Sequence, residues 1–155
     1  MTEPATDQQI LEGHLVYELD MLRGTGHLLT VVQSRPDQPL TVIQTNALIE
    51  SFATHARNLI EFFNNVRYQD TVRAEEFTVS RSYDPEFVQW DQMEDLRVRI
   101  NKQISHLTRS RGENKVDGID RQNILRLLLR EAEKFRSEVR PDLLQWLPPR
   151  FGEPT

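Results

Sequence analysis

Apolar side chains recur at helical spacing along four stretches of this chain. The clearest stripe follows steps of three and four residues, and it consists of Leu48, Phe52, His55, Leu59, Phe62 and Val66. Such steps keep side chains on one side of a helix, whereas a half-buried strand would show alternation. The stripe therefore predicts a helix over residues 42-67, with His55 as its one polar member.

Three further amphipathic stretches and one short apolar segment complete the pattern. They predict helices over residues 7-33, 85-109 and 121-140, and a short terminal helix over 142-147. Their stripes are Ile10, Leu11, His14, Met21, Leu22, Leu28, Leu29 and Val32 on the first, Met93, Leu96, Ile100, Ile104 and Leu107 on the third, and Ile124, Leu128, Ala132, Phe135 and Val139 on the fourth. Each helix is expected to bury its stripe against the others.

Local signals mark where these helices begin and end. Thr41 with Gln44 is a capping-box pattern, in which a hydroxyl and an amide each accept a backbone N–H at the helix start. Thr6 with Gln9 repeats this pattern ahead of the first helix. Pro141 is expected to break the fourth helix, because proline lacks a backbone donor and clashes with the preceding turn.

Three other features bear on the course of the chain. Asp84 followed by Pro85 is typical of a helix start, with Asp as the N-cap and Pro in the first turn. Gly24 and Gly26 interrupt the first helix, and they predict a bend or a close contact between helices. The connection over residues 68-83 is long for a helical bundle, and we expect a short extended piece within it.

Four amphipathic helices without convincing strand pairs predict an all-α protein, an antiparallel four-helix bundle with a short C-terminal helix. A chain of 155 residues with a hydrophobic fraction of 37% can cover one core, so residues 1-155 are expected to form a single domain. Residues 125-129 make the fourth helix apolar around more than half of its circumference. That width predicts contact with two neighbouring helices or with a second subunit, and we expect a homodimer.

Composition excludes several classes of function. The chain has no cysteine, which excludes disulfides, thiolate metal sites and thiol catalysis. It shows neither a signal-like N-terminus nor an apolar run near the roughly 20 residues of a membrane span, so we expect a cytoplasmic protein without membrane contact. It lacks a Gly-rich phosphate loop and a serine-hydrolase elbow, and no cofactor is expected. A net charge of −5 argues against nonspecific coating of nucleic acid.

Positive charge is nevertheless concentrated in one stretch. Residues 97-111 contain five Lys or Arg side chains and no Asp or Glu. They directly follow residues 74-95, in which acidic side chains predominate. This asymmetry allows a local anion site on an acidic protein, or equally a dimer in which one half of the chain meets the other.

Arg99 and His106 are the candidate catalytic residues of the basic stretch. They lie seven residues apart, which is two helical turns, so both project from nearly the same face beside the core stripe. Arginine can hold a phosphate through its planar guanidinium, and histidine can give or take a proton near neutral pH during phosphodiester cleavage. The same side chains could equally form an ordinary solvated helix face. Supporting binding residues would be Asn101, Lys102, Gln103 and Arg109.

The segment RINKQISHL, which begins at Arg99, resembles the Arg-x(4–6)-His motif of HEPN domains. These domains are helical bundles found among bacterial toxins, abortive-infection proteins and RNA-processing factors, and residues 46-63 are similar in style to their long helix. The resemblance implies an RNA-binding, metal-independent endoribonuclease that acts as a dimer, with Arg99 and His106 of both chains converging on RNA; some members only bind. The chain departs from the motif at Ile100, where active members often carry a polar residue, and Asn101 follows one position later.

Two other functions fit the same sequence. The basic stretch or the leucine-rich fourth helix could belong to a non-catalytic module that binds an acidic protein or a second copy of the chain. A histidine-based metal site is the third interpretation, because His14, His55 and His106 fall on three different predicted helices. Against it, we expect His55 to be a buried neutral side chain bonded to a backbone carbonyl or to a neighbour such as Tyr17. Di-metal bundles also need Glu-x-x-His pairs, which this chain lacks.

Overall fold

Three long helices dominate the computed structural model, which describes residues 4–33, 37, 40–65, 70–86, 98, 100 and 118–151. The long helices are α1 (Val16–Gln33), α2 (Val42–Phe63) and α4 (Gly118–Glu138), and the short elements are the π-helix η1 (Gln9–Leu15) and the 3-10 helices η2 (Ala74–Glu76) and η4 (Leu144–Trp146). Over the described ranges the structure contains no named strand. The all-α prediction is therefore confirmed.

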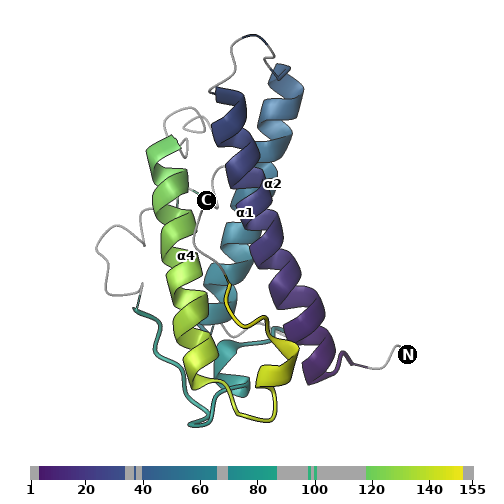
Figure 1. The fold of residues 1–155 in the computed structure, drawn as a ribbon, viewed down its shortest axis with the longest axis vertical. Coiled ribbons are helices and arrows are strands. Elements are labelled where there is room, and N and C mark those ends of the chain that lie inside the picture. Colours follow the sequence, from purple (N-terminus) through teal and green to yellow (C-terminus); the bar gives the residue numbers. More distant parts are fainter. Residues whose placement is uncertain are drawn as a thin grey trace.

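The helices lie side by side around one apolar core. Figure 1 shows α1 and α2 as an antiparallel hairpin, with α4 packed against both and running in the same direction as α2. The largest fully buried side chains come from all three helices, and Ile100 joins the same core with 1% of its surface exposed. The burial predicted for Ile100 is thus confirmed. Of the described residues within the predicted third helix, Val98 and Ile100 are α-helical, whereas Pro85 and Glu86 at its predicted start are not.

The first helix begins where its capping box predicts. The Gln9 backbone N–H donates to Thr6 Oγ1 at 3.3 Å, and the Thr6 N–H donates to Gln9 Oε1 at 2.9 Å. The burial predicted for His14 is wrong, because His14 is exposed and Leu15 is buried in its place. The buried residues of this segment are Leu11, Leu15, Leu19, Leu22 and Leu29, and the first two of them belong to η1. Leu28 is also outside the core, at 48% exposed.

The second helix also begins at its predicted cap but ends earlier than predicted. The Gln44 N–H donates to Thr41 Oγ1 at 3.2 Å, and both halves of the capping box are present. The helix ends at Phe63 rather than at residue 67, because Asn65 adopts a left-handed conformation with φ of 53°. Asn65 then holds the following segment: its Nδ2 donates to the Tyr83 carbonyl at 2.8 Å.

The segment 70–86 crosses the base of the helices and contains the expected short extended piece. Thr78 forms an isolated antiparallel bridge with Val139. Asp84 was predicted to cap a helix by accepting a backbone N–H just after it. The Glu86 N–H donates instead to Glu131 Oε2 on α4, at 3.1 Å. Apart from Pro85, Glu86, Val98 and Ile100, the helix predicted over residues 85-109 lies outside the described residues.

The fourth predicted helix is the most closely confirmed. Every residue of its predicted stripe is buried: Ile124, Leu128, Ala132, Phe135 and Val139. Leu127 and Leu129 are buried as well, so the chain itself covers both flanks of α4, as the two-neighbour alternative predicts. The helix starts three residues earlier than predicted and ends at Glu138, ahead of Pro141. The short terminal helix is the 3-10 turn η4, which is narrower than the predicted 142-147.

Candidate functional site

The predicted Arg-x(4–6)-His motif lies outside the part of the chain that the structure describes. This holds for Arg99, Asn101, Lys102, Gln103, His106 and Arg109. The described Ile100 lies between the first two of them and is buried in the core. Candidate sites among the described residues therefore come from α1, α2, α4 and the segments that connect them.

His55 of α2 forms a pair with Glu18 of α1. The distance from His55 Nδ1 to Glu18 Oε2 is 2.7 Å, and Asn58 Nδ2 donates to the same carboxylate at 3.2 Å. The ring of Tyr17 contacts the imidazole edge to face, with centroids 5.6 Å apart. The expected burial of His55 is confirmed. Of the two expected kinds of partner, the structure shows a nearby side chain rather than a backbone carbonyl: the Glu18 carboxylate, with Tyr17 in ring contact.

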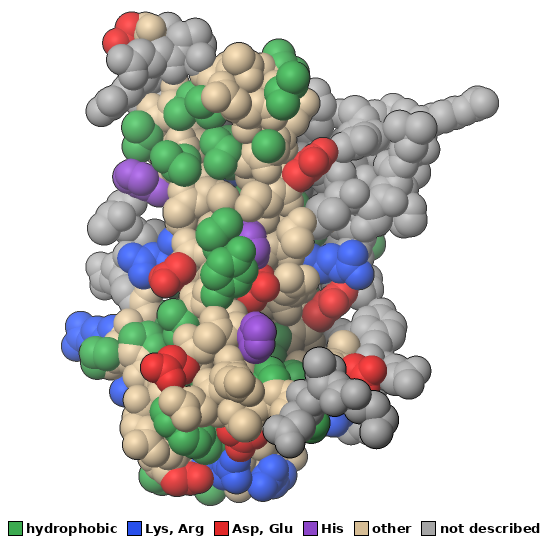
Figure 2. Space-filling view, turned by 90° about the vertical axis from the view of Figure 1, so that its right-hand side faces the viewer, with side chains coloured by type: hydrophobic (Ala, Val, Ile, Leu, Met, Phe, Trp, Pro, Cys, Tyr) green, Lys and Arg blue, Asp and Glu red, His purple; other side chains and the backbone are tan. Residues whose placement is uncertain are grey.

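No group of three or more metal-ligating side chains is found among the described residues. His14, one member of the proposed histidine site, is exposed on η1, whereas His55 is buried against α1. Figure 2 shows histidine side chains spread along the face formed by α1 and α2, with acidic and hydrophobic side chains between them. The third member, His106, lies outside the described residues.

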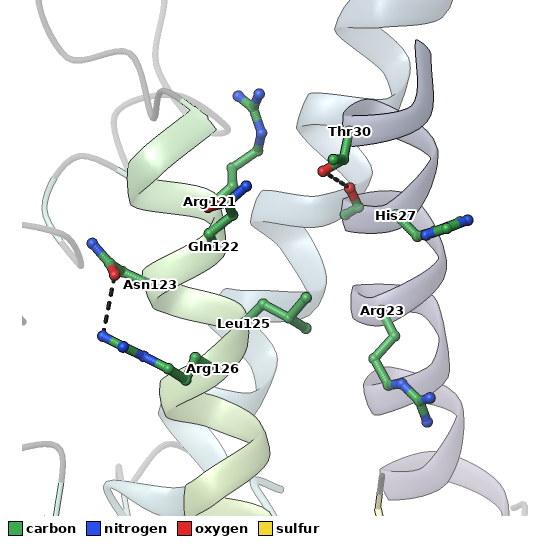
Figure 3. A pocket seen from close by; sticks show the side chains of 9 residues that line it. Arg23, His27, Thr30, Arg121, Gln122, Asn123, Leu125 and Arg126 are labelled. Carbon is green, nitrogen blue, oxygen red and sulfur yellow. Dashed lines mark hydrogen bonds between the residues drawn. The ribbon is translucent and has the colours of Figure 1, made fainter. Parts of the chain in front are cut away.

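A pocket of about 350 Å³ lies between α1 and α4. Its described lining consists of Arg23, Gly26, His27 and Thr30 from α1 and Arg121, Gln122, Asn123, Leu125 and Arg126 from α4. Figure 3 shows Leu125 pointing from α4 toward α1, whereas Arg126 extends on the side of α4 away from α1 and meets Asn123 there. Three arginines, one histidine and no carboxylate line the described part of the pocket, so it is cationic although the chain is acidic overall.

Two of these arginines bind neutral oxygen atoms in the described part of the chain. Arg23 Nη1 donates to the Phe151 carbonyl at 3.0 Å, and Arg126 Nη2 donates to Asn123 Oδ1 at 3.3 Å. Elsewhere in the described chain, five cationic side chains pair with carboxylates at 2.8 to 3.1 Å: Arg57, Arg73, Arg130, Lys134 and Arg140. Arg81 and Arg136, like Arg23, donate to backbone carbonyls. Among the described contacts, the guanidinium groups of Arg23 and Arg126 are therefore not paired with a carboxylate.

The polar residues of an amphipathic helix usually face solvent, but two charged residues of α4 do not. Arg121 and Glu131 are buried, at 7% and 2% exposed. Glu131 Oε1 accepts a 2.5 Å hydrogen bond from the Tyr83 hydroxyl. Burial, reinforced by the bond to Glu131 and its charge, raises the pKa of Tyr83 far above its ordinary value. The hydrogen bond between Tyr83 and Glu131 therefore joins the segment 70–86 to α4.

Other charged residues of α4 hold the C-terminal segment. Glu133 Oε1 accepts the Phe151 N–H at 2.6 Å, and Arg136 Nε donates to the Pro148 carbonyl at 2.8 Å. Arg23 of α1 binds the carbonyl of the same Phe151, whose side chain is buried. Sequence reasoning missed these contacts because each joins a side chain to a backbone group far along the chain. The available signal was the unusual number of charges on an otherwise leucine-rich helix.

Comparison with protein-family models, with curated proteins and with solved structures finds no match for this chain. Among the described helices, none is both long and apolar enough to cross a membrane. What the chain does has therefore to be inferred from its own residues.

Proposed function

We propose that this chain is a HEPN-like RNA-binding bundle, and that Arg99 and His106 make it a metal-independent endoribonuclease. The observation that carries the proposal is the burial of Ile100 in a helical conformation. On a helix each residue turns by about 100°, so with Ile100 directed into the core, positions 99 and 106 fall within about 20° of each other on one flank. This is the arrangement that the motif requires.

We also propose that the predicted helix over residues 85-109 completes an antiparallel four-helix bundle. α2 and α4 run in the same direction (Figure 1). An element between them in sequence that packs beside both would therefore run the opposite way, as in an up-down-up-down bundle. Helical Val98 and buried Ile100 support its packing into the common core.

The proposed chemistry needs only the RNA itself and the two side chains. The 2′-hydroxyl attacks the adjacent phosphorus, the bond to the 5′-oxygen breaks, and the products carry a 2′,3′-cyclic phosphate and a 5′-hydroxyl. His106 accepts the proton of the attacking 2′-hydroxyl, and the leaving 5′-oxygen gains a proton from water or from the His106 of a second chain. Arg99 binds the phosphate oxygens and stabilises their negative charge. Asn101, Lys102, Gln103 and Arg109 would contact neighbouring parts of the RNA backbone.

RNA binding is tested by fluorescence anisotropy with a labelled single-stranded RNA over a series of salt concentrations. The expected affinity falls as salt rises, because phosphate contacts release counterions. Arg99→Ala is expected to weaken binding by about tenfold or more, the usual effect of removing a hydrogen bond from a charged group. Arg150→Ala is the matched control, because Arg150 is exposed and its substitution removes the same charge. Equal loss in both variants, or no binding by the wild type, contradicts the proposal.

A second candidate function is a dimerisation module, and one observation favours it. Val42 and Ile43, at the start of α2, are 76% and 81% exposed, and Leu28 on α1 is 48% exposed. Figure 2 shows hydrophobic side chains gathered toward this end of the molecule. Exposed apolar side chains that gather in one place are typical of interaction surfaces. This surface differs from the leucine-rich face of α4, which is buried within the chain.

Sedimentation velocity at several protein concentrations tests the dimer. The double variant Val42→Lys, Ile43→Lys places charge on the exposed first turn of α2 and leaves the core unchanged. A wild type that dimerises with rising concentration, together with a variant that stays monomeric, supports this surface. A wild type that is monomeric throughout removes the dimerisation module from consideration.

A further inference from the structure

We propose that the pocket between α1 and α4 binds a nucleoside phosphate. None of the described residues that line the pocket belongs to the Arg99–His106 motif, and the inference does not rest on RNA cleavage. Its volume of about 350 Å³ lies within the range of roughly 300 to 1,000 Å³ that is usual for small-molecule sites. Around it, arginines match the phosphate, an apolar side chain matches the face of the base, and amide side chains match its edge.

The phosphate would bind to the arginines. Arg23 and Arg126 each spend one donor on a neutral oxygen, and every guanidinium has five N–H groups. Both line the pocket, Arg23 from α1 and Arg126 from α4. A phosphate bound by either guanidinium would receive charge-assisted hydrogen bonds, which are roughly twice as strong as neutral ones.

The base would be held by the apolar floor and the amide side chains. Leu125 points from α4 toward α1 (Figure 3). Gly26 of α1 also lines the pocket and has no side chain. Gln122 and Asn123 each carry both a donor and an acceptor, which are the groups that base edges pair with. The floor and the amides would thus contact the face and the edge of a base.

Simpler ligands use less of this lining. Inorganic phosphate would leave Leu125 and both amides without a role. A fatty acid would use the arginines and Leu125 but offer no hydrogen bond to the Gln122 amide, and burying that amide without a partner is unfavourable. A nucleoside phosphate uses the cationic, apolar and amide groups together, whether it arrives as a free nucleotide or as one unit of an RNA strand.

The test is a titration of uniformly ¹⁵N-labelled protein followed by amide chemical shifts. The probes are adenosine 5′-monophosphate, uridine 5′-monophosphate, a five-nucleotide RNA, inorganic phosphate and adenosine. Specific binding is expected to shift amides of the pocket lining, including Gly26, Thr30 and Gln122. Shifts with the free nucleotides identify a nucleotide site, and shifts with the five-nucleotide RNA alone identify RNA as the source of the ligand; both outcomes support the proposal.

Two variants separate the pocket from general surface charge. Arg126→Gln is expected to weaken binding of the probe by about tenfold, since it removes a charged donor from the lining. Arg130→Gln is the matched control, because Arg130 lies one turn further along α4, is exposed and pairs with Glu86. Binding that is weakened by Arg126→Gln alone supports the site. Equal weakening by both variants overturns it.

Three other results also overturn the proposal. They are equal affinity for inorganic phosphate, equal affinity for adenosine without its phosphate, and the absence of pocket shifts with every probe. The same titration of His106→Ala keeps this inference distinct from the nuclease proposal. Nucleotide binding retained in His106→Ala is expected if the pocket acts independently of the motif, and its loss in a folded variant contradicts that independence.

Discussion

The Tyr83 hydroxyl donates a 2.5 Å hydrogen bond to Glu131 Oε1 in the interior of the molecule. Residues 83 and 131 are both buried, and the second oxygen of the carboxylate accepts the Glu86 N–H. The pair therefore joins the segment 70–86 to the middle of α4. The ammonium of Lys134 lies 4.2 Å from the centre of the Tyr83 ring and covers its face.

Tyr83→Phe is expected to lower the free energy of unfolding by about 1 to 3 kcal/mol at neutral pH. The substitution keeps the ring and its contact with Lys134, but it leaves a buried carboxylate without one of its donors. Urea denaturation followed by circular dichroism measures the change. Tyr17→Phe is the control, because Tyr17 is 53% exposed. Equal effects of the two substitutions would contradict a special role for the buried pair.

The same pair predicts a dependence of stability on alkaline pH. Burial, then the hydrogen bond and charge of Glu131, raise the pKa of Tyr83, so the folded protein keeps the phenol protonated where the unfolded chain ionises it. Its contribution is complete below about pH 10 and is lost as the pH rises above that value, by up to about 1.4 kcal/mol per pH unit. Denaturation between pH 9 and 11 should show a steeper fall for the wild type than for Tyr83→Phe. Parallel curves would show that Tyr83 titrates normally.

Gly24 and Gly26 should respond in opposite ways to larger side chains. A Cβ at Gly24 meets nothing within 4 Å, so Gly24→Ala is expected to stabilise α1 by up to about 1 kcal/mol. A Cβ at Gly26 would lie 3.2 Å from the Phe52 ring, and Gly26→Val should therefore cost about 1 to 3 kcal/mol by overpacking the helix contact. Thermal unfolding of both variants checks the pair, and a stabilised Gly26→Val would refute the close contact.

Glu18 and His55 are expected to couple across the α1–α2 contact. Their side chains are 22% and 11% exposed, and Nδ1 lies 2.7 Å from the carboxylate. A double-mutant cycle with Glu18→Gln and His55→Gln should give a coupling free energy of about 0.5 to 3 kcal/mol at neutral pH. The more exposed pair Arg57 and Glu61 provides the comparison, with about 0.3 to 0.5 kcal/mol expected. A smaller coupling for Glu18 and His55 than for the control pair would count against their structural role.

Local patterns predicted the parts of the fold that depend on neighbours in sequence. The cap formed by Thr41 and Gln44 is confirmed, because its hydrogen bonds join residues three apart. The stripe from Ile124 to Val139 is confirmed for a similar reason, since helical periodicity alone decides which face is apolar. The choice of His14 over Leu15 was wrong, because both continue the periodicity from Leu11 and only packing decides between them.

Contacts between distant residues could not be predicted in this way. Glu131 reads as one more charge on α4 until the fold places Tyr83 beside it. The cationic pocket likewise combines Arg23 with Arg126, which belong to helices at opposite ends of the chain. His55 was recognisable as unusual because it interrupts an apolar stripe, but its partner Glu18 lies on another helix. The candidate motif itself lies outside the described residues, so its role stays a prediction.

RNA cleavage in the presence of EDTA tests the central proposal most directly. Folded wild-type protein is expected to cut single-stranded RNA into products with 2′,3′-cyclic phosphate ends, and to leave the DNA of the same sequence intact because it lacks the 2′-hydroxyl. His106→Ala should reduce the rate by about 100-fold or more, the usual contribution of a general acid or base. His14→Ala, which removes an exposed histidine, should leave the rate unchanged. Intact RNA with the wild type, or equal cleavage by His106→Ala, would contradict the nuclease proposal.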